Sequence, residues 1–322
     1  MASRRLIAVA AVAAALVGCA APGSPAGPGQ GPAAIGTCPM FPADNYWHAD
    51  VSALPLDPSS AAWAASIGTS SHVHADFGSG TWDGGPIGIP FTTVGAGQPR
   101  VPVSFDYADE SDPGPYPLPS DAPIEGGPTS TGDRHVLVVD NSDCHLYEMY
   151  AAYPSTTSWT AGSGAVYDLT SDAMRPSGWT SADAAGLPML PGLVRYDEVA
   201  AGHIDHAIRF TAPLTQSAFI WPARHQAGST SDASAPPMGA WFRLRSDYDT
   251  SRFTGAARII ADAMKQHGII LADNGSSWYL SGAPDPRWDN DQLHQLDVIT
   301  GADFQAVASG LLVADPNSGR TR

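Results

Sequence analysis

Short apolar or alternating runs, separated by Gly, Pro, Asn and Asp, make up most of this chain. Such runs with turn residues between them are typical of short β-strands. The clearest ones lie at 134–140, 145–150, 204–211, 217–222, 240–244 and 276–280. Many short strands and few helices predict an all-β fold, a β-sandwich or a jelly roll, with two or three peripheral α-helices.

Three segments instead have helical spacing, at 57–68, 254–267 and 291–299. Pro58 suits the first turn of the first helix, and Gly68 suits its end. Thr254 is the expected cap of the second helix, and Asp289 or Asn290 that of the third.

The first 18 residues have the features of a lipoprotein signal peptide. Arg4 and Arg5 precede an apolar run over residues 6–17, and the Leu-Val-Gly-Cys sequence that ends at Cys19 resembles a lipobox. The run is shorter than the roughly 20 residues of a membrane-spanning helix. We therefore expect an extracytoplasmic protein anchored through lipid on Cys19, its only contact with the membrane. Cleavage as an ordinary secretory signal would instead give a secreted protein.

Composition divides the rest of the chain. Residues 19–37 are rich in Pro, Gly and Ala and predict a flexible linker. A single folded domain is expected over 38–313 and a disordered tail over 314–322. Cys38 and Cys144 are left for one disulfide in an oxidising compartment, although two unrelated buried thiols are the alternative.

Charge and missing motifs exclude several classes of function. Lys and Arg number 16 and Asp and Glu 32, so the net charge of −16 excludes nucleic acid as a partner. The sequence contains no GxSxG, P-loop or dinucleotide-binding motif. It also has no HExxH or paired-Cys motif. We therefore expect neither a cofactor nor a metal.

A hairpin over residues 134–150 is the main candidate for chemistry. With a four-residue loop over 141–144, Asp140 is opposite His145 and His135 is opposite Tyr150. One face then carries the apolar residues Val136, Val138, Tyr147 and Met149. The other face carries His135, Leu137, Val139, Leu146, Glu148 and Tyr150.

Glu148 is the expected general acid of this second face, because apolar neighbours raise the pKa of a carboxyl group. His135 and Tyr150 lie beside it in this register. The second carboxylate is Asp133 or Glu125, since Asp140 falls on the opposite face. The alternative is a half-hydrated sheet face with a His–Glu contact and no chemistry.

Three further segments contribute candidate binding residues. His72, His74 and Asp76 point the same way in an extended strand, where they suit an anionic substrate or, with a further distant ligand, a metal. Arg209 lies on the polar face of 204–211 and suits an acidic sugar or an ion pair with Asp197 or Glu198. Trp288 stands among acidic residues and suits stacking on a sugar ring.

Four segments of the chain resemble a group of exported bacterial proteins: 41–47, 132–150, 181–211 and 272–293. The resemblance implies a single exported domain, with a carboxylate at Glu148 and an Asp-His pair like Asp205-His206. It implies no activity and assigns no catalytic residue.

These features together predict an extracytoplasmic enzyme that cleaves a carbohydrate polymer. A glycoside hydrolase would use carboxylates as general acid and as base or nucleophile. A polysaccharide lyase is the alternative, in which His135 or Tyr150 abstracts a proton and Arg209 neutralises a uronate. A non-catalytic glycan-binding or cell-envelope lipoprotein is the third interpretation.

Overall fold

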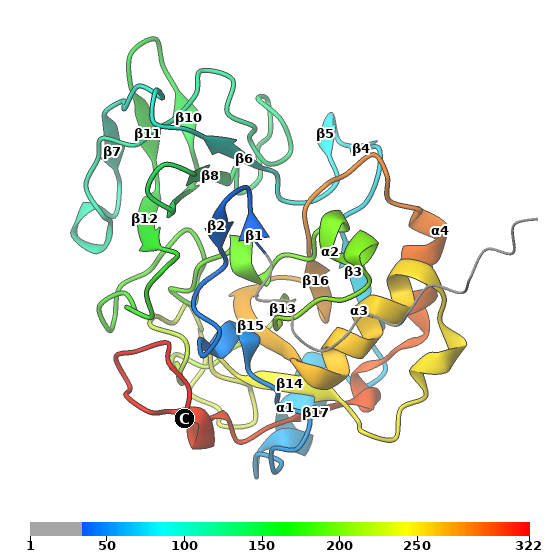
Figure 1. Cartoon of the computed structure of the whole chain (residues 1–322). Coiled ribbons are helices and arrows are strands. Elements are labelled where there is room, and N and C mark those ends of the chain that lie inside the picture. Colours follow the sequence, from blue (N-terminus) through cyan, green and yellow to red (C-terminus); the bar gives the residue numbers. More distant parts are fainter. Residues whose placement is uncertain (1–33) are drawn as a thin grey trace, which may run out of the picture. The chain divides into compact units, whose positions relative to one another are not determined.

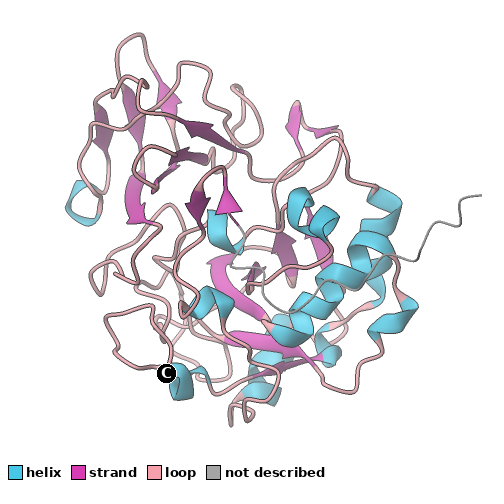
Figure 2. Ribbon diagram, in the orientation of Figure 1, coloured by secondary structure: helices cyan, strands magenta, loops and turns pink. Residues whose placement is uncertain are grey.

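The computed structural model describes residues 34–322. The signal peptide, Cys19 and most of the linker that the sequence predicts lie outside the described residues. All described residues belong to one compact unit. Strands predominate in it, with four short α-helices and many loops between them (Figures 1 and 2). The expectation of a β-rich fold is confirmed in this sense.

A six-stranded sheet combines β3, from the first third of the chain, with five strands of its C-terminal half (Figure 1). Its order is β17-β14-β15-β13-β16-β3, and the β13–β15 and β16–β3 pairs are parallel. The strands are β3 (His74–Asp76), β13 (Ile208–Ala212), β14 (Trp241–Leu244), β15 (Ile269–Asn274), β16 (Tyr279–Ser281) and β17 (Phe304–Ala306). Phe210 on one face stacks on Trp278 and packs edge-on against Phe242 in the main core.

A four-stranded sheet contains the expected hairpin. Its order is β12-β9-β8-β6. The strands are β6 (Phe91–Val94), β8 (Val136–Asp140), β9 (His145–Tyr150) and β12 (Ser163–Asp168). Asp140 pairs with His145, and Leu137 pairs with Glu148. The predicted register is therefore confirmed.

Both faces of this hairpin are buried. Val136, Val138, Tyr147 and Met149 belong to a smaller core, together with residues of the segment 116–124. Leu137, Val139 and Leu146 on the other face belong to the main core. The second face is thus packed against the rest of the domain, and the interpretation of a half-hydrated face is wrong.

The smaller sheets lie around these two. A three-stranded sheet has the order β10-β11-β7, and two hairpins stand alone. Their strands are β1 (Ala34–Ile35), β2 (Cys38–Pro39), β4 (Thr81–Trp82), β5 (Gly85–Pro86), β7 (Val103–Phe105), β10 (Tyr153–Pro154) and β11 (Trp159–Ala161). The β1–β2 hairpin includes the end of the expected linker. The run at 217–222 forms only an isolated bridge from Phe219 to Met238.

The three expected helices are present, although the third is a 3-10 helix beyond Leu293, and a fourth was not predicted. They are α1 (Ser60–Ile67), α2 (Tyr196–Ala201), α3 (Gly255–Gln266) and α4 (Asn290–Leu293). The 3-10 helices are η1 (Tyr46–His48), η2 (Ala108–Glu110), η3 (Leu190–Gly192), η4 (Thr250–Arg252), η5 (His294–Val298), η6 (Gly301–Asp303) and η7 (Ser309–Leu312). Asp289 caps α4, because its carboxylate accepts hydrogen bonds from the backbone of Asp291 and Gln292.

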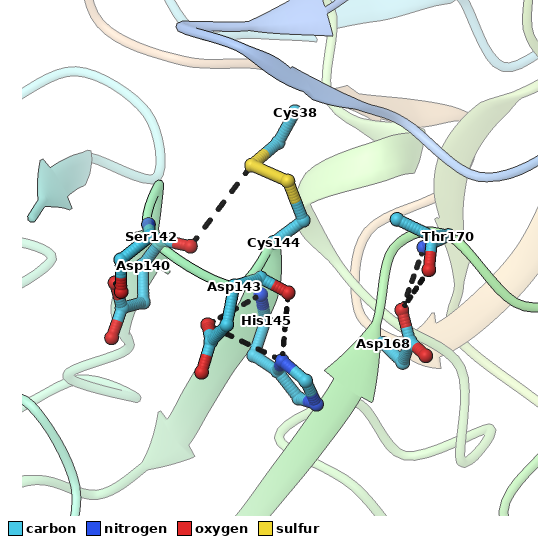
Figure 3. The surroundings of a disulfide bond; sticks show 8 residues. All are labelled: Cys38, Asp140, Ser142, Asp143, Cys144, His145, Asp168 and Thr170. Carbon is cyan, nitrogen blue, oxygen red and sulfur yellow. Dashed lines mark hydrogen bonds and ion pairs between the residues drawn. A yellow bond between two sulfur atoms is a disulfide. The ribbon is translucent and has the colours of Figure 1, made fainter. Parts of the chain in front are cut away.

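The expected disulfide between Cys38 and Cys144 is present (Figure 3). It connects β2 to the loop between β8 and β9. The expected disordered tail is instead ordered. Thr321 donates from its backbone to Asp44, and Asn317 accepts a hydrogen bond from Arg224. The tail is polar because it lies at the surface, yet its backbone pairs with the start of the domain.

Candidate functional site

A cleft of about 1000 Å³ opens over one face of the six-stranded sheet. Strands β3, β13 and β16 form one wall. The β4–β5 hairpin, the loop over 125–133 and helix α4 form the others. This loop begins within the C-terminal end of the Pro-rich segment 111–130.

Polar residues from four strands form two adjacent rows across this wall. Tyr279 pairs with His74 and with Thr211, and Thr211 pairs with Asp273. In the next row Ser281 pairs with Asp76. The hydroxyl of Ser281 accepts a hydrogen bond from Arg209 at 2.7 Å. All of these side chains line the cleft because residues two apart on a strand share a face.

Arg209 holds two carboxylates together. Its guanidinium donates to buried Asp183 at 2.8 Å and to Asp273 at 2.9 Å. The Asp183 side chain has no exposed area, whereas 22% of the Asp273 side chain is exposed. Burial raises the pKa of both carboxyl groups against the opposing effect of Arg209, and the pKa of Asp273 rises to about 6. Asp273 is therefore the carboxyl group of this pair that is accessible from the cleft.

His135 and Glu125 form a second pair in the same cleft. Nδ1 of His135 lies 2.5 Å from Oε2 of Glu125, and Nε2 lies 3.0 Å from the carbonyl oxygen of Ala182. Both partners are acceptors, so we assign a proton to each ring nitrogen. Burial opposes this charge, but Glu125 outweighs it and raises the pKa of His135 to about 9. Burial likewise opposes ionisation of Glu125, yet His135 lowers its pKa.

The charge balance explains the raised pKa of Asp273. Asp183, Asp273 and Glu125 face only two cations, Arg209 and protonated His135. A buried negative charge without a partner is costly, so the excess favours protonation. Asp76 lies in the same cleft, and burial raises its pKa as well.

The expected role of Glu148 is not supported by its position. Glu148 is fully buried and does not line the cleft. Its carboxylate accepts hydrogen bonds from the backbone of Met189 at 2.9 Å and of Leu190 at 2.9 Å. Burial raises its pKa to about 7, against these two hydrogen bonds. The carboxyl group is therefore perturbed as expected, but no substrate reaches it.

The structure also does not support the roles expected of Tyr150 and Trp288. Tyr150 packs against the His135 ring with centroids 5.8 Å apart, but it does not line the cleft. Trp288 is buried between Phe77 and Tyr196, and its indole donates to the carbonyl of Ala283. Trp288 is therefore not available to a sugar.

The other candidate residues from the sequence lie together in the cleft. Glu125, Asp133, His135, His74, Asp76 and Arg209 all line the cleft. The alternative pairing of Arg209 with Asp197 or Glu198 is wrong, because Glu198 pairs with Arg195 and His206. Sequence reasoning missed Asp273 and Trp82. Asp273 ends an apolar run at 269–272, and a polar residue at the end of a buried strand is a signal for it.

No group of three or more His, Cys, Asp or Glu residues in 34–322 is arranged to hold a metal ion. Over the same residues, no helix is long and apolar enough to cross a membrane. Comparisons with protein-family models, with curated proteins and with solved structures gave no match. The chemistry of the cleft therefore carries the functional argument.

Proposed function

We propose that this protein is an extracytoplasmic glycoside hydrolase whose active site is the cleft around Asp273 and Glu125. The observation that supports it is a pair of cleft carboxyl groups with opposite pKa shifts. Groups whose environments push their pKa values apart are typical of an acid and its partner base. This arrangement moves the general acid from Glu148 to Asp273.

In the proposed reaction, protonated Asp273 donates its proton to the oxygen of the scissile glycosidic bond. Ionised Glu125 acts on the other side of the sugar, either as the base for a water molecule or as the nucleophile. His135 is a positioning residue, because it holds Glu125 ionised through the 2.5 Å contact. The stereochemistry of the product, followed by NMR, distinguishes the two roles of Glu125.

The alternative lyase reaction has less support. It needs a cation that neutralises a uronate carboxylate in the cleft. Arg209 is the only Arg or Lys among the residues that line the cleft, and Asp183 and Asp273 already occupy it. A uronate would therefore enter a cleft with an excess of negative charge.

The architecture and location are part of the same proposal. Leu137 and Val139 of the four-stranded sheet share the main core with Phe210 and Leu280 of the six-stranded sheet, which supports a sandwich-like framework. The disulfide supports an oxidising compartment outside the cytoplasm. Lipidation of Cys19 would anchor the protein there.

The test is the release of reducing ends from a panel of neutral, amino and acidic polysaccharides. We expect cleavage of at least one of them, and a loss of kcat of at least about 100-fold in Asp273→Asn and in Glu125→Gln. Asp262→Asn is the matched control and should retain activity, because the Asp262 side chain on α3 is about half exposed and does not line the cleft. No cleavage of any polymer, an unsaturated ultraviolet-absorbing product, or full activity of both cleft variants would each refute the proposal.

A further inference from the structure

Trp82 stands at the cleft with most of its surface uncovered. It lines the cleft, and 79% of its surface is exposed, more than for any other large hydrophobic residue in the described part of the chain. The indole belongs to the β4–β5 hairpin, which projects at the upper edge of the view in Figure 1. An aromatic side chain that is exposed at a cleft is free to stack on a ligand.

The hairpin is fixed against the loop that carries Glu125. Trp82 pairs with Gly85, and the backbone of Gly85 contacts the backbone of Gly126. A Cβ atom at Gly85 would lie 2.2 Å from the carbonyl carbon of Gly126, so only glycine permits this approach. Gly126 directly follows Glu125. The position of Trp82 is thereby set relative to the proposed catalytic carboxylate.

The charges of the cleft restrict which sugars can lie beside Trp82. The lining includes six carboxyl groups, those of Asp76, Asp83, Glu125, Asp133, Asp273 and Asp297. The cations that line it are Arg209 and protonated His135, and both are already paired, Arg209 with two aspartates and His135 with Glu125. Asp83 directly follows Trp82 at the turn of the hairpin. A cationic ligand therefore gains attraction here, and an anionic ligand is repelled.

We propose that Trp82 is the stacking platform of a subsite that binds a cationic glycan, a polymer of hexosamines with free amino groups. The pyranose ring packs its C–H groups on the indole, as sugars do on aromatic faces. The ammonium groups lie near the carboxylates of the cleft, where the ring face of Trp82 also attracts a cation. This inference rests on the proposed function and names its substrate class.

The first test measures binding by calorimetry at fixed low salt, with hexosamine oligomers that carry free amines. Matched N-acetylated and uronate oligomers serve as comparison ligands. We expect the free-amine oligomers to bind about tenfold more tightly than the N-acetylated ones, and the difference to shrink at high salt. Equal affinity for both, or preference for the uronates, would overturn the proposed ligand class.

The second test removes the platform. Trp82→Ala should weaken binding of the free-amine oligomers about tenfold, and Trp82→Tyr should retain most of the affinity, since a phenol ring also stacks. Leu311→Ala is the control, because Leu311 is exposed but does not line the cleft. Unchanged affinity in Trp82→Ala would refute the platform.

The third test displaces the hairpin without touching the indole. Gly85→Ala should weaken the same binding, whereas Gly95→Ala, where a Cβ meets no neighbour, should not. Equal affinity in both would show that the hairpin position is irrelevant. These readouts do not depend on turnover. Selective binding without cleavage would refute the hydrolase proposal alone, and cleavage without amine selectivity would refute this inference alone.

Discussion

Arg209 connects the wall of the cleft to the core, since its Nη2 lies 2.9 Å from Oδ2 of Asp273 while its Nε lies 2.8 Å from Oδ2 of Asp183. The carboxylate of Asp183 has no contact with solvent. Its charge is compatible with the fold because the guanidinium and the backbone of Ala185 face it. Because Arg209 contacts both carboxylates, Asp273 lies near the buried charge of Asp183, which raises the pKa of Asp273.

Arg209→Met should therefore destabilise the protein strongly. Removing one partner of a buried ion pair leaves an uncompensated charge and costs about 3–5 kcal/mol. Arg258→Met on α3 is the matched control, because its pair with Asp262 is about half exposed and contributes less than about 0.5 kcal/mol. Urea unfolding of both variants measures the difference. Equal losses of unfolding free energy would contradict the role given to Arg209.

The proposed acid and base predict an activity maximum in acid. Asp273 must be protonated, and its pKa is raised to about 6, so kcat/KM should fall above about pH 6. Glu125 must be ionised, and His135 keeps its pKa below the ordinary value, so activity should persist into more acidic solution. The pH profile of the purified protein on its best substrate checks this. A rate that increases from pH 6 to pH 8 would exclude Asp273 as the acid.

Glu148 should make the stability of the protein depend on pH. Its pKa is about 7 in the folded state and about 4.5 in the unfolded chain, so the folded state binds the proton more tightly. This contribution is fully present below about pH 4.5 and is lost as the pH rises through 7. At 1.36 kcal/mol per pKa unit it amounts to about 3 kcal/mol.

Glu148→Gln should remove this dependence. The difference in unfolding free energy between variant and wild type, measured from pH 4.5 to pH 8, isolates the contribution of the group from that of His135. Glu110→Gln is the control, because its side chain is about one-third exposed. A difference that does not change with pH would show that Glu148 is already ionised in the folded state at low pH.

Loss of the disulfide should lower stability without abolishing the cleft. Cys38 and Cys144 are separated by 106 residues, and closing a loop of this length stabilises by about 4 kcal/mol in the chain-entropy model. Denaturant unfolding of the double Cys38→Ser and Cys144→Ser variant checks the value. Reduced wild type should unfold at the same midpoint as this variant. A midpoint unchanged by reduction would show that the crosslink contributes nothing.

Local structure was largely predictable from the sequence. Side chains alternate along a strand, so the four-residue loop before His145 sufficed to place Glu148 and Leu137 opposite each other. Capping chemistry is equally local, which is why Gly68 and Asp289 mark the ends of helices correctly. The candidates His74, Asp76 and Arg209 were also named from alternation alone.

Their meeting in one cleft was not predictable. Asp273 lies beside Arg209 because β15 pairs in parallel with β13, although more than 60 residues separate the two side chains. Glu148 is inaccessible because the backbone of Met189 and Leu190 covers its face of the hairpin. Neither contact can be recognised from the residues that neighbour Arg209 or Glu148 in the sequence.

The sequence by itself determined which residues share a strand face and where helices start and end. These are decided by covalent geometry and by interactions between near neighbours. Only the tertiary structure decided which polar face opens to solvent and which is buried, because that depends on the layer packed against each sheet. For this protein, that distinction separates Asp273, which faces the cleft, from Glu148, which lies within the core.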